Sequence, residues 1–336
     1  MSLKAIKIPT FEFVAKQIYA LIFSGILIAI SIGSLSIQGL KLGIDFTGGT
    51  LVEAGFDKTA NVEQIRSKLA QDGFIGSDVQ YFGSTKEVLI RLKPQEISSA
   101  ELSTRVISLL GDGADIRRVE FVGPKIGDEL TEDGGLAMLY ALIGILIYVA
   151  FRFEYRFALG SISALIHDVI ITLGFFSVFQ LEFDLTVLAA ILAVIGYSLN
   201  DTIVVFDRIR ENFLLTRKTD SKVIVNDALN QTLSRTLMTS ITTLLVLIAL
   251  FFLGGQIINS FALALIIGVF IGTYSSIFVA SAMVLAMGIK KEDMLPSEKE
   301  KQEIDDSHNL CQSSFRGAHR LGAKHAQNQE AHHECQ

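Results

Sequence analysis

Apolar residues gather into six long segments along the chain, separated by polar stretches. Each segment is long enough to cross a hydrocarbon core of about 30 Å as a helix. The segments cover residues 18–38, 135–151, 157–179, 185–206, 236–253 and 260–287. A long polar insertion separates the first from the second. This pattern predicts a polytopic α-helical membrane protein with six transmembrane helices and one inserted domain.

The polar insertion, residues 41–127, switches between two-residue and helical periodicity. Its segments are Thr50–Phe56, Asn61–Gln71, Val79–Phe82, Val88–Leu92, a helix that runs from the capping-box pattern Ser98–Glu101 to Leu110, and Ile116–Val122. Their order is β-α-β-β-α-β, the split βαβ arrangement. We therefore expect a small α+β ferredoxin-like domain.

The composition agrees with a membrane protein. Half of the 336 residues are hydrophobic and the net charge is only −6, so the chain as a whole is too apolar for an ordinary soluble protein, and no nucleic-acid partner is expected. The first apolar segment follows three lysines, as in a signal peptide, but it is long and lacks a small-residue cleavage site. We interpret it as an uncleaved anchor, with residues 1–17 before it and the first transmembrane region at 18–40.

Lysine and arginine in the short loops indicate the orientation. Arg152, Arg156, the run from Arg208 to Lys222, and Lys290 with Lys291 all fall on one side. The opposite loops, residues 180–184 and 254–259, contain no lysine or arginine. Both termini are therefore expected in the cytoplasm and the inserted domain in the periplasm, followed by a five-helix bundle over residues 128–287.

Two carboxylates interrupt the apolar segments, and such residues are functional candidates because an intramembrane charge is costly. At 1.5 Å per residue, Asp201 lies roughly 8 Å and Asp168 roughly 16 Å inside the cytoplasmic edge of the segments. Asp201 shares a helix face with Tyr197 and Ser198, while Asn200 points about a quarter turn away. His167 precedes Asp168, and a hydrogen-bonded interface histidine is the favoured interpretation over a proton relay.

Arg235 stands at the cytoplasmic mouth of the fifth segment, on a stripe with Thr239. It can be an ordinary arginine that extends its charge to the membrane surface. It would also lie at a depth similar to that of Asp201, where a guanidinium would hold the carboxylate ionised until a proton displaced it. The amphipathic stretch from Val223 to Leu233 before it suggests a helix near the inner surface.

Glycine-rich sequences flank the inserted domain. The motif G-I-D-F-T-G-G-T starts at Gly43, where glycines suit positive φ or close backbone approach. Gly123, Pro124 and Gly127 predict a hinge between the domain and the second helix. Neither a nucleotide-binding spacing nor a nucleophile–base pair or metal set is found in the domain, so we expect no enzyme, no cofactor and no metal.

The last helix and the tail differ in character. Small residues at positions 268, 272, 275, 276, 280 and 281 predict close helix approach. The tail, residues 288–336, is polar and contains both cysteines, Cys311 and Cys335, and five of the six histidines. Their spacing fits no structural zinc pattern, so a disordered cytoplasmic tail is expected.

Several motifs in order resemble those of the SecF family of protein-export membrane subunits, within the resistance-nodulation-division superfamily. They are G-I-D-F-T-G-G-T, V-G-P-K-I-G, L-I-H-D, A-V-I-G-Y-S-L-N-D-T-I-V-V-F-D-R-I-R-E-N and S-R-T. The resemblance covers about residues 1–305. The resemblance implies a bacterial inner-membrane subunit that pairs with SecD into a twelve-helix unit beside the SecYEG channel. Accessory Sec membrane subunits, lipid, protons and the unfolded translocating polypeptide are its other implied partners.

The resemblance also implies that the proton-motive force drives late translocation and release of the polypeptide. The aspartate of its N-D pair and the arginine of its S-R-T match Asp201 and Arg235, which would transfer protons, with Asp168 as a supporting member. Tyr197, Ser198, Asn200 and Thr239 would form a polar seam. Two alternatives remain at this point: a half-transporter for lipid or drug, and a purely structural subunit that stabilises SecD and the channel.

Overall fold

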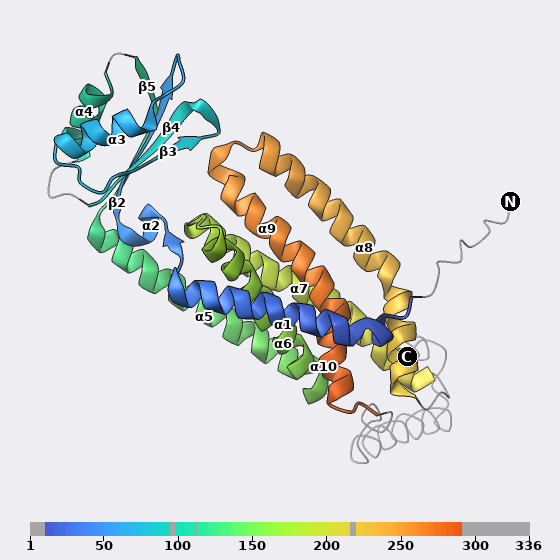
Figure 1. The fold of residues 1–336 in the computed structure, drawn as a ribbon. Coiled ribbons are helices and arrows are strands. Elements are labelled where there is room, and N and C mark those ends of the chain that lie inside the picture. The colour runs from blue at the N-terminus through green and yellow to red at the C-terminus, as the bar shows by residue number, and fades with distance from the viewer. Residues whose placement is uncertain (1–10, 95–98, 112, 216–219, 291–336) are drawn as a thin grey trace, which may run out of the picture. The chain divides into compact units, whose positions relative to one another are not determined.

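The computed structural model describes residues 11–94, 99–111, 113–215 and 220–290. Within them, six helical runs are long and apolar enough to cross a membrane. They are α1 (Phe13–Ile37), α5 (Pro124–Arg152), α6 (Tyr155–Val178), α7 (Leu185–Leu215), α8 (Ser221–Leu253), and a last run built from α9 (Gln256–Ser275), η1 (Ser276–Ala280) and α10 (Ser281–Ala286). The predicted six-helix membrane architecture is confirmed (Figure 1). Ser98 of the predicted capping box and the cysteine- and histidine-containing tail lie outside the described residues.

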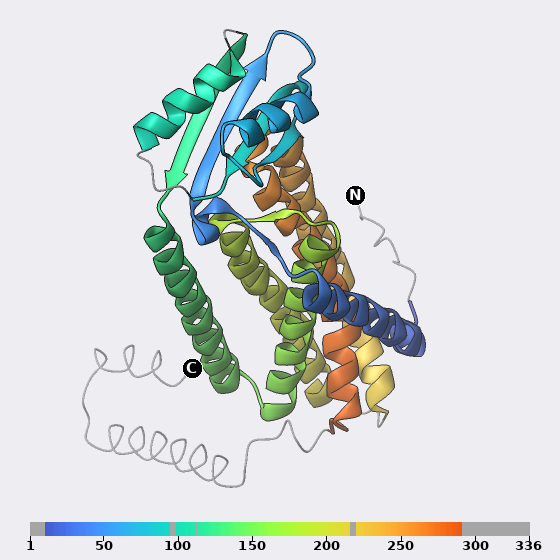
Figure 2. The ribbon, with the colours of Figure 1, turned by 60° about the vertical axis from the view of Figure 1, so that its left-hand side comes forward.

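The inserted domain contains a four-stranded antiparallel sheet with two helices on one face (Figure 2). Its elements are β2 (Gly49–Phe56), α3 (Val62–Gln71), β3 (Asp78–Phe82), β4 (Ser84–Leu92), α4 (Ser99–Leu110) and β5 (Ala114–Val122). The strands lie in the order β3-β4-β2-β5, so each helix crosses over one strand. This order is that of the split βαβ arrangement, and the predicted α+β domain is present.

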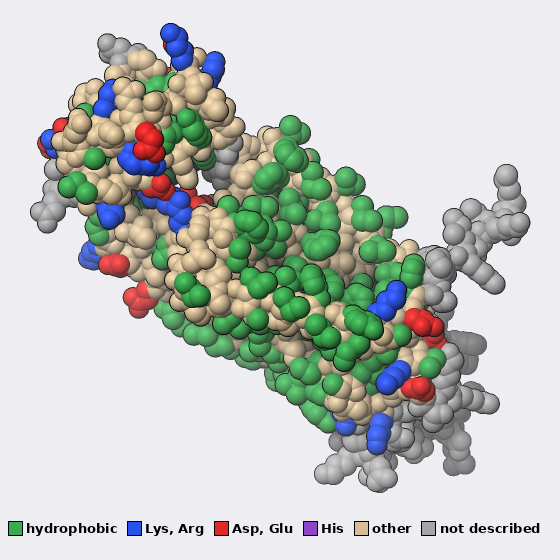
Figure 3. Space-filling model, in the orientation of Figure 1, with side chains coloured by type: hydrophobic (Ala, Val, Ile, Leu, Met, Phe, Trp, Pro, Cys, Tyr) green, Lys and Arg blue, Asp and Glu red, His purple; other side chains and the backbone are tan. Residues whose placement is uncertain are grey.

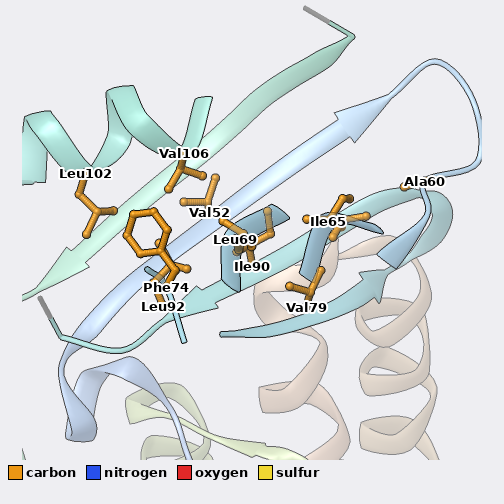
Figure 4. Packing of buried hydrophobic residues seen from close by; sticks show 11 residues of the cluster. Val52, Ala60, Ile65, Leu69, Phe74, Val79, Ile90, Leu92, Leu102 and Val106 are labelled. Carbon is orange, nitrogen blue, oxygen red and sulfur yellow. The ribbon is translucent and has the colours of Figure 1, made fainter. Parts of the chain in front are cut away.

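The core of this sheet domain lies between the sheet and the two helices (Figure 4). Val52 and Ile90 from the central strands meet Leu69 of α3 and Leu102 of α4, all fully buried. Burying such a side chain contributes about 1.5–3 kcal/mol. Asn61 begins α3 by accepting a hydrogen bond from the Gln64 N–H at 3.1 Å, as an N-cap residue does.

The helices of the bundle differ in how far they are enclosed. The apolar windows of α6, α7 and the last run are 56%, 50% and 50% buried, whereas that of α5 is 6% buried. Hydrophobic side chains cover the visible face of the bundle, and charged side chains gather at its two ends (Figure 3). The exposed helices therefore present apolar surface of the kind that lipid or another membrane subunit covers.

Small residues let the enclosed helices approach closely, as the sequence predicts. A Cβ added to Gly268 of α9 would lie 2.0 Å from Val194 Cγ2 of α7. At Gly174 of α6, an added Cβ would lie 2.1 Å from Ser31 Oγ of α1. Larger side chains at these two positions would force the helices apart, because real Cβ atoms do not approach other atoms so closely.

The N-terminus of α1 is capped by side chains of another helix. Glu12, which precedes α1, makes no side-chain cap bond. Instead, Asn226 Oδ1 of α8 accepts the Phe13 N–H at 2.8 Å, and Asn230 Oδ1 accepts the Phe11 N–H at 2.7 Å. The Phe13 N–H, which helix geometry leaves without a partner, is thus satisfied, and the Phe11 contact fixes the residues before α1 against α8.

The helix predicted over the amphipathic stretch from Val223 to Leu233 is present in α8. The structure joins it without a break to the fifth membrane span, in one continuous helix from Ser221 to Leu253. No glycine or proline interrupts this range. The buried face of the amphipathic part, including Ile224 and Leu229, continues directly into that of the membrane span at Thr236.

Candidate functional site

Asp168 lies at the centre of the bundle with all of its oxygens occupied. It is fully buried on α6. Ser198 of α7 and Ser275 of α9 donate hydrogen bonds to Oδ2, at 2.5 and 2.8 Å. His167 Nδ1 lies 2.8 Å from Oδ1. One carboxylate thereby joins three helices, and the predicted seam residue Ser198 is one of its partners.

The hydrogen bonds continue from Asp168 to α1. His167 Nε2 lies 3.0 Å from Ser24 Oγ, and Ser24 Oγ lies 3.0 Å from the Tyr274 hydroxyl of α9. Tyr274 in turn donates to the Ala20 carbonyl at 2.6 Å. We refer to Ala20, Ser24, His167, Asp168 and Tyr274 as the histidine network. It supports the hydrogen-bonded interpretation of His167.

Asp201, one turn after Ser198 on α7, has different surroundings. Its side chain is buried, with 4% of the residue exposed. Its Oδ2 atom has no hydrogen-bond partner among the described residues. Burying a carboxylate oxygen without a hydrogen-bond partner costs free energy. A proton, a cation or a hydrogen-bond donor would therefore stabilise the side chain at this position.

Contacts between α7 and α8 show how deep in the bundle Asp201 lies relative to Arg235 of α8. The Tyr197 hydroxyl of α7 donates to Ser240 Oγ of α8 at 3.3 Å. From these residues, Asp201 is four positions further along α7, and Arg235 is five positions back along the antiparallel α8. At 1.5 Å per residue they lie about 6 Å and about 7.5 Å from that contact, in the same direction.

A second set of contacts, which passes through α9, gives the same alignment of α7 with α8. Ser240 Oγ lies 2.7 Å from Thr273 Oγ1 of α9. A Cβ added to the adjacent Gly272 would lie 3.0 Å from Ser198 Cβ. The positive charge of Arg235 acts on the Asp201 carboxylate, yet its exposed side chain makes no hydrogen bond to Oδ2.

The other predicted seam residues take several positions. Tyr197 is half-buried, whereas Asn200 lies on the exposed side of α7. The Thr239 hydroxyl bonds back to the carbonyls of Arg235 and Thr236. Thr236 was not predicted, although its buried hydroxyl has no partner in the described part of the chain and lies level with Asp201. It directly follows Arg235 and is the last residue of the S-R-T motif.

The sheet domain is attached to the bundle through a second polar site, at the other end of α6 and α7. Strand β1 (Lys41–Leu42) pairs in parallel with β6 (Glu182–Phe183), which lies between these helices. The rings of Phe46 and Phe183 stack with centroids 5.9 Å apart. We call residues 41–47 and 182–187 the clasp.

Carboxylates of the clasp cap α7. Asp45 of the single-turn helix α2 (Ile44–Thr47) accepts the Leu185 N–H at 3.1 Å. Asp184 accepts the Val187 N–H at 2.8 Å and the Thr186 hydroxyl at 2.7 Å. Negative charge at a helix N-terminus is favourable, so the aspartate of the glycine-rich motif positions the helix that carries Asp201.

Ion pairs complete the clasp. Arg91 of β4 pairs with Glu182, and Lys41 lies 2.9 Å from Asp78 of β3. Burial raises the pKa of Glu182, although the Arg91 guanidinium beside it acts in the opposite direction. Nearby Asp184 also raises the Glu182 pKa and Lys41 lowers it. The ionised form of Glu182 in the clasp is therefore less stable, relative to its protonated form, than that of an ordinary glutamate.

The predicted hinge residues lie beside the clasp. Gly123 precedes α5 in extended conformation and Pro124 is its first residue. Gly127 lies inside α5, and a Cβ there would be 2.8 Å from the Gly48 nitrogen. Gly48 has a φ of 67°. Gly48 and Gly127 are thus needed for close backbone approach, whereas a Cβ at Gly123 would meet no atom within 4 Å. Hinge motion stays a prediction.

Two further features of the described residues bear on the choice of site. Among residues that the structure describes, no group of three or more His, Cys, Asp or Glu is placed to hold a metal ion. An open pocket of about 380 Å³ between α7 and α9 is lined by Leu185, Thr186, Ala189, Ile258 and Phe261, with no ionisable group. The buried carboxylates are therefore the candidate functional centre.

Comparison with protein families gives two matches. Residues 104–290 match the model described as "Protein export membrane protein SecD/SecF, C-terminal". Residues 33–60, which contain the glycine-rich motif, match the "SecD/SecF GG Motif". Together with the six helices and the buried polar site, these matches define an integral membrane protein of the protein-export class.

Individual relatives agree. The chain is 55% identical over 294 residues to the protein translocase subunit SecF of Vibrio alginolyticus, covering 85% of this chain and 93% of the relative. It is 46% identical over 306 residues to that of Pseudomonas aeruginosa, covering 90% and 99%. The chain belongs to the SecF family of protein translocase subunits, which are inner-membrane transport components.

Solved structures extend this likeness. The crystal structure of SecDF from Thermus thermophilus matches with a TM-score of 0.78 and 41% identity over 85% of this chain. SecDF in a form titled super-membrane-facing matches with a TM-score of 0.62 and 38% identity over 92%. The chain spans about 40% of the length of each SecDF chain.

Proposed function

We propose that this chain pairs with a SecD subunit and uses the proton-motive force to promote late translocation and release of polypeptides through the SecYEG channel. Pairing is supported by the solved SecDF chains, of which this chain matches about 40%. A shared family model for the GG motif of SecD and SecF supports two related halves, hence a twelve-helix unit.

The proton would act at Asp201. The single observation that carries this proposal is the buried Oδ2 atom of Asp201, which has no hydrogen-bond partner in the described part of the chain and lies level with an exposed Arg235. In one state the carboxylate is ionised and paired with Arg235, and in the other it is protonated and released. Each state favours a different packing of α7 and α8, so a local charge change biases the bundle.

The driving force is sufficient for such a bias. One elementary charge that crosses 100 mV is worth about 2.3 kcal/mol. Asp168 would support the cycle as the fixed partner of α7, because Ser198 ties α7 to it near Asp201. Protons would enter from the periplasmic side along a seam between this chain and SecD.

The proposed orientation follows from charge. Arg152, Arg156, Arg208 and Lys222 lie around the end of the bundle away from the sheet domain, which we assign to the cytoplasm with both termini. The sheet domain is then periplasmic, where the exported polypeptide emerges. Displacement of α7 would reach this domain through the clasp, because Asp45 caps α7 directly.

Movement of the sheet domain about Gly123, Pro124 and Gly127 is part of the proposal. The clasp limits it, since β1–β6 pairing and the Arg91–Glu182 pair would have to open or move with the domain. A cross-link between the domain and the loop near Gly254 tests this point. Undiminished export after cross-linking would count against the hinge.

The deciding experiment measures export-linked proton conductance in vesicles that contain the SecD partner. We expect Asp201→Asn to assemble normally but to lose proton-dependent stimulation of export. Asp201→Glu, which keeps the carboxylate, is expected to retain part of it. Glu211→Gln is the matched control, because it removes an exposed carboxylate from the same helix. Full stimulation in Asp201→Asn would contradict the proposal and favour a purely structural subunit.

A further inference from the structure

The histidine network contains four consecutive contacts that each require one proton between two heavy atoms. They run from the Ala20 carbonyl to Tyr274 (2.6 Å), from Tyr274 to Ser24 (3.0 Å), from Ser24 to His167 Nε2 (3.0 Å), and from His167 Nδ1 to Asp168 (2.8 Å). A hydroxyl supplies one proton, and an imidazole ring supplies one or two.

The number of protons available for these four contacts depends on the charge states of His167 and Asp168. With neutral His167 and ionised Asp168, the tyrosine, the serine and the ring supply three protons for four contacts. One oxygen–oxygen or oxygen–nitrogen pair would then face each other without a proton. With both ring nitrogens protonated, His167 donates to Asp168 and Ser24, Ser24 donates to Tyr274, and Tyr274 donates to Ala20. All four contacts are then satisfied in one direction.

The charges around the pair also favour a ring that carries two protons. The side chains of His167 and Asp168 are 2% and 1% exposed, so an ionised Asp168 beside a neutral ring would leave a net charge inside the bundle. The groups that face the pair are the hydroxyls of Ser24 from α1, Ser198 from α7, and Ser275 and Tyr274 from α9. None of these partners carries a compensating charge.

We propose that His167 and Asp168 form a second proton-binding site, in which the additional proton lies on the His167 ring and Asp168 stays ionised, as the two serine donors on its Oδ2 atom favour. Loss of that proton removes one of the contacts that tie α1 to α6 and α9. The π-turn η1 begins two residues after Tyr274, and such turns are frequent at functional sites in helices. The role of the site in transport rests on the proposed proton-driven function, but its proton content does not.

The proton content can be read directly by nitrogen NMR. The sample is the full chain with its SecD partner in lipid, with labelled histidine only in this chain. His308, His319, His325, His332 and His333 are changed to Gln, which leaves His167 as the single labelled histidine. We expect two protonated ring nitrogens at neutral pH. One protonated and one unprotonated nitrogen would overturn the inference.

Matched variants test the link between the proton and the helix contact. Tyr274→Phe removes two contacts and one proton, so the remaining two contacts need only one ring proton, and the signal of the second N–H is expected to weaken. Ser198→Ala removes a donor to the other oxygen of Asp168 and is expected to leave both ring signals in place. An unchanged spectrum in Tyr274→Phe would overturn the link.

The same spectrum separates this inference from the role of Asp201. In Asp201→Asn we expect both ring signals of His167 to persist, because Asp201 is not a member of the histidine network. If export stimulation survives in Asp201→Asn while His167 keeps both protons, only the proposed function falls. If stimulation is lost and the native ring carries one proton, only the second site falls.

Discussion

Asp168 and Asp201 are carboxylates on neighbouring helices of one bundle, yet their surroundings are opposite. Both are buried. Asp168 accepts two serine hydroxyls and contacts a histidine, while one oxygen of Asp201 has no partner among the residues that the structure describes. Burial alone therefore does not determine how firmly a carboxylate is held in the bundle. The number of its hydrogen-bond partners matters as well, because a buried polar atom without a partner carries an energetic cost that a satisfied one does not.

Removing Asp168 is expected to have the largest effect. Asp168→Ala leaves His167, Ser198 and Ser275 without their common acceptor inside the bundle. Breaking a buried pair in this way costs about 3–5 kcal/mol. We expect a strongly reduced yield and a lower thermal midpoint of the complex with SecD. A stable, fully assembled Asp168→Ala complex would remove the contrast with Asp201.

The two serine donors sharpen the contrast. Ser275→Ala and Ser198→Ala each remove one hydrogen bond to Asp168, and we expect a loss of about 1–2 kcal/mol each. Thermal unfolding of the complex measures it. Ser163→Ala is the control, because the Ser163 hydroxyl is exposed and bonds only to its own helix, at the Leu159 carbonyl. Equal effects at all three positions would show that Asp168 is not specially supported.

Glu182 in the clasp adds a third carboxylate to the comparison. Because its pKa is raised, the folded state binds its proton more tightly than the unfolded state. Its contribution to stability is therefore greatest at low pH and falls as pH rises from the ordinary glutamate value through the raised one. Glu182→Gln should remove this part of the slope. Thermal midpoints across that pH range provide the measurement, and an unaltered slope would contradict the assignment.

Asp201 is expected to matter least for stability. Asp201→Ala removes a buried carboxylate oxygen that makes no hydrogen bond within residues 11–94, 99–111, 113–215 and 220–290. We therefore expect the thermal midpoint to stay the same or to rise slightly, even though export stimulation is lost. A large destabilisation would mean that Asp201 has a structural partner on SecD, and the contrast between the two carboxylates would then disappear.

Much of this molecule could be predicted from the sequence. Hydrophobic periodicity predicts the six spans and the order of strands and helices, because these depend on residues close in the chain. The cost of intramembrane charge identifies Asp168 and Asp201. Arg235 could be placed near the depth of Asp201, because both distances are counted along helices.

The partners of these residues could not be predicted, for a physical reason. Tyr274 and Ser24 reach His167 from α9 and α1, and their meeting depends on how helices far apart in sequence pack together. The clasp could not be predicted either, because two-residue strands such as β1 and β6 leave no periodic signal in the sequence. The continuity of α8, by contrast, could have been inferred from the absence of glycine and proline between Ser221 and Leu253.

The parallel pairing of β1 with β6 has a consequence for biosynthesis. All four strands of the main sheet have been synthesised once Val122 has left the ribosome, so that sheet can form early. Its attachment cannot, because Lys41 must wait for Glu182, which follows α5 and α6 in the chain. Such a long-range pairing is slow to form. The sheet domain is therefore expected to fold first and dock later, only after α5 and α6 have entered the membrane in the correct order.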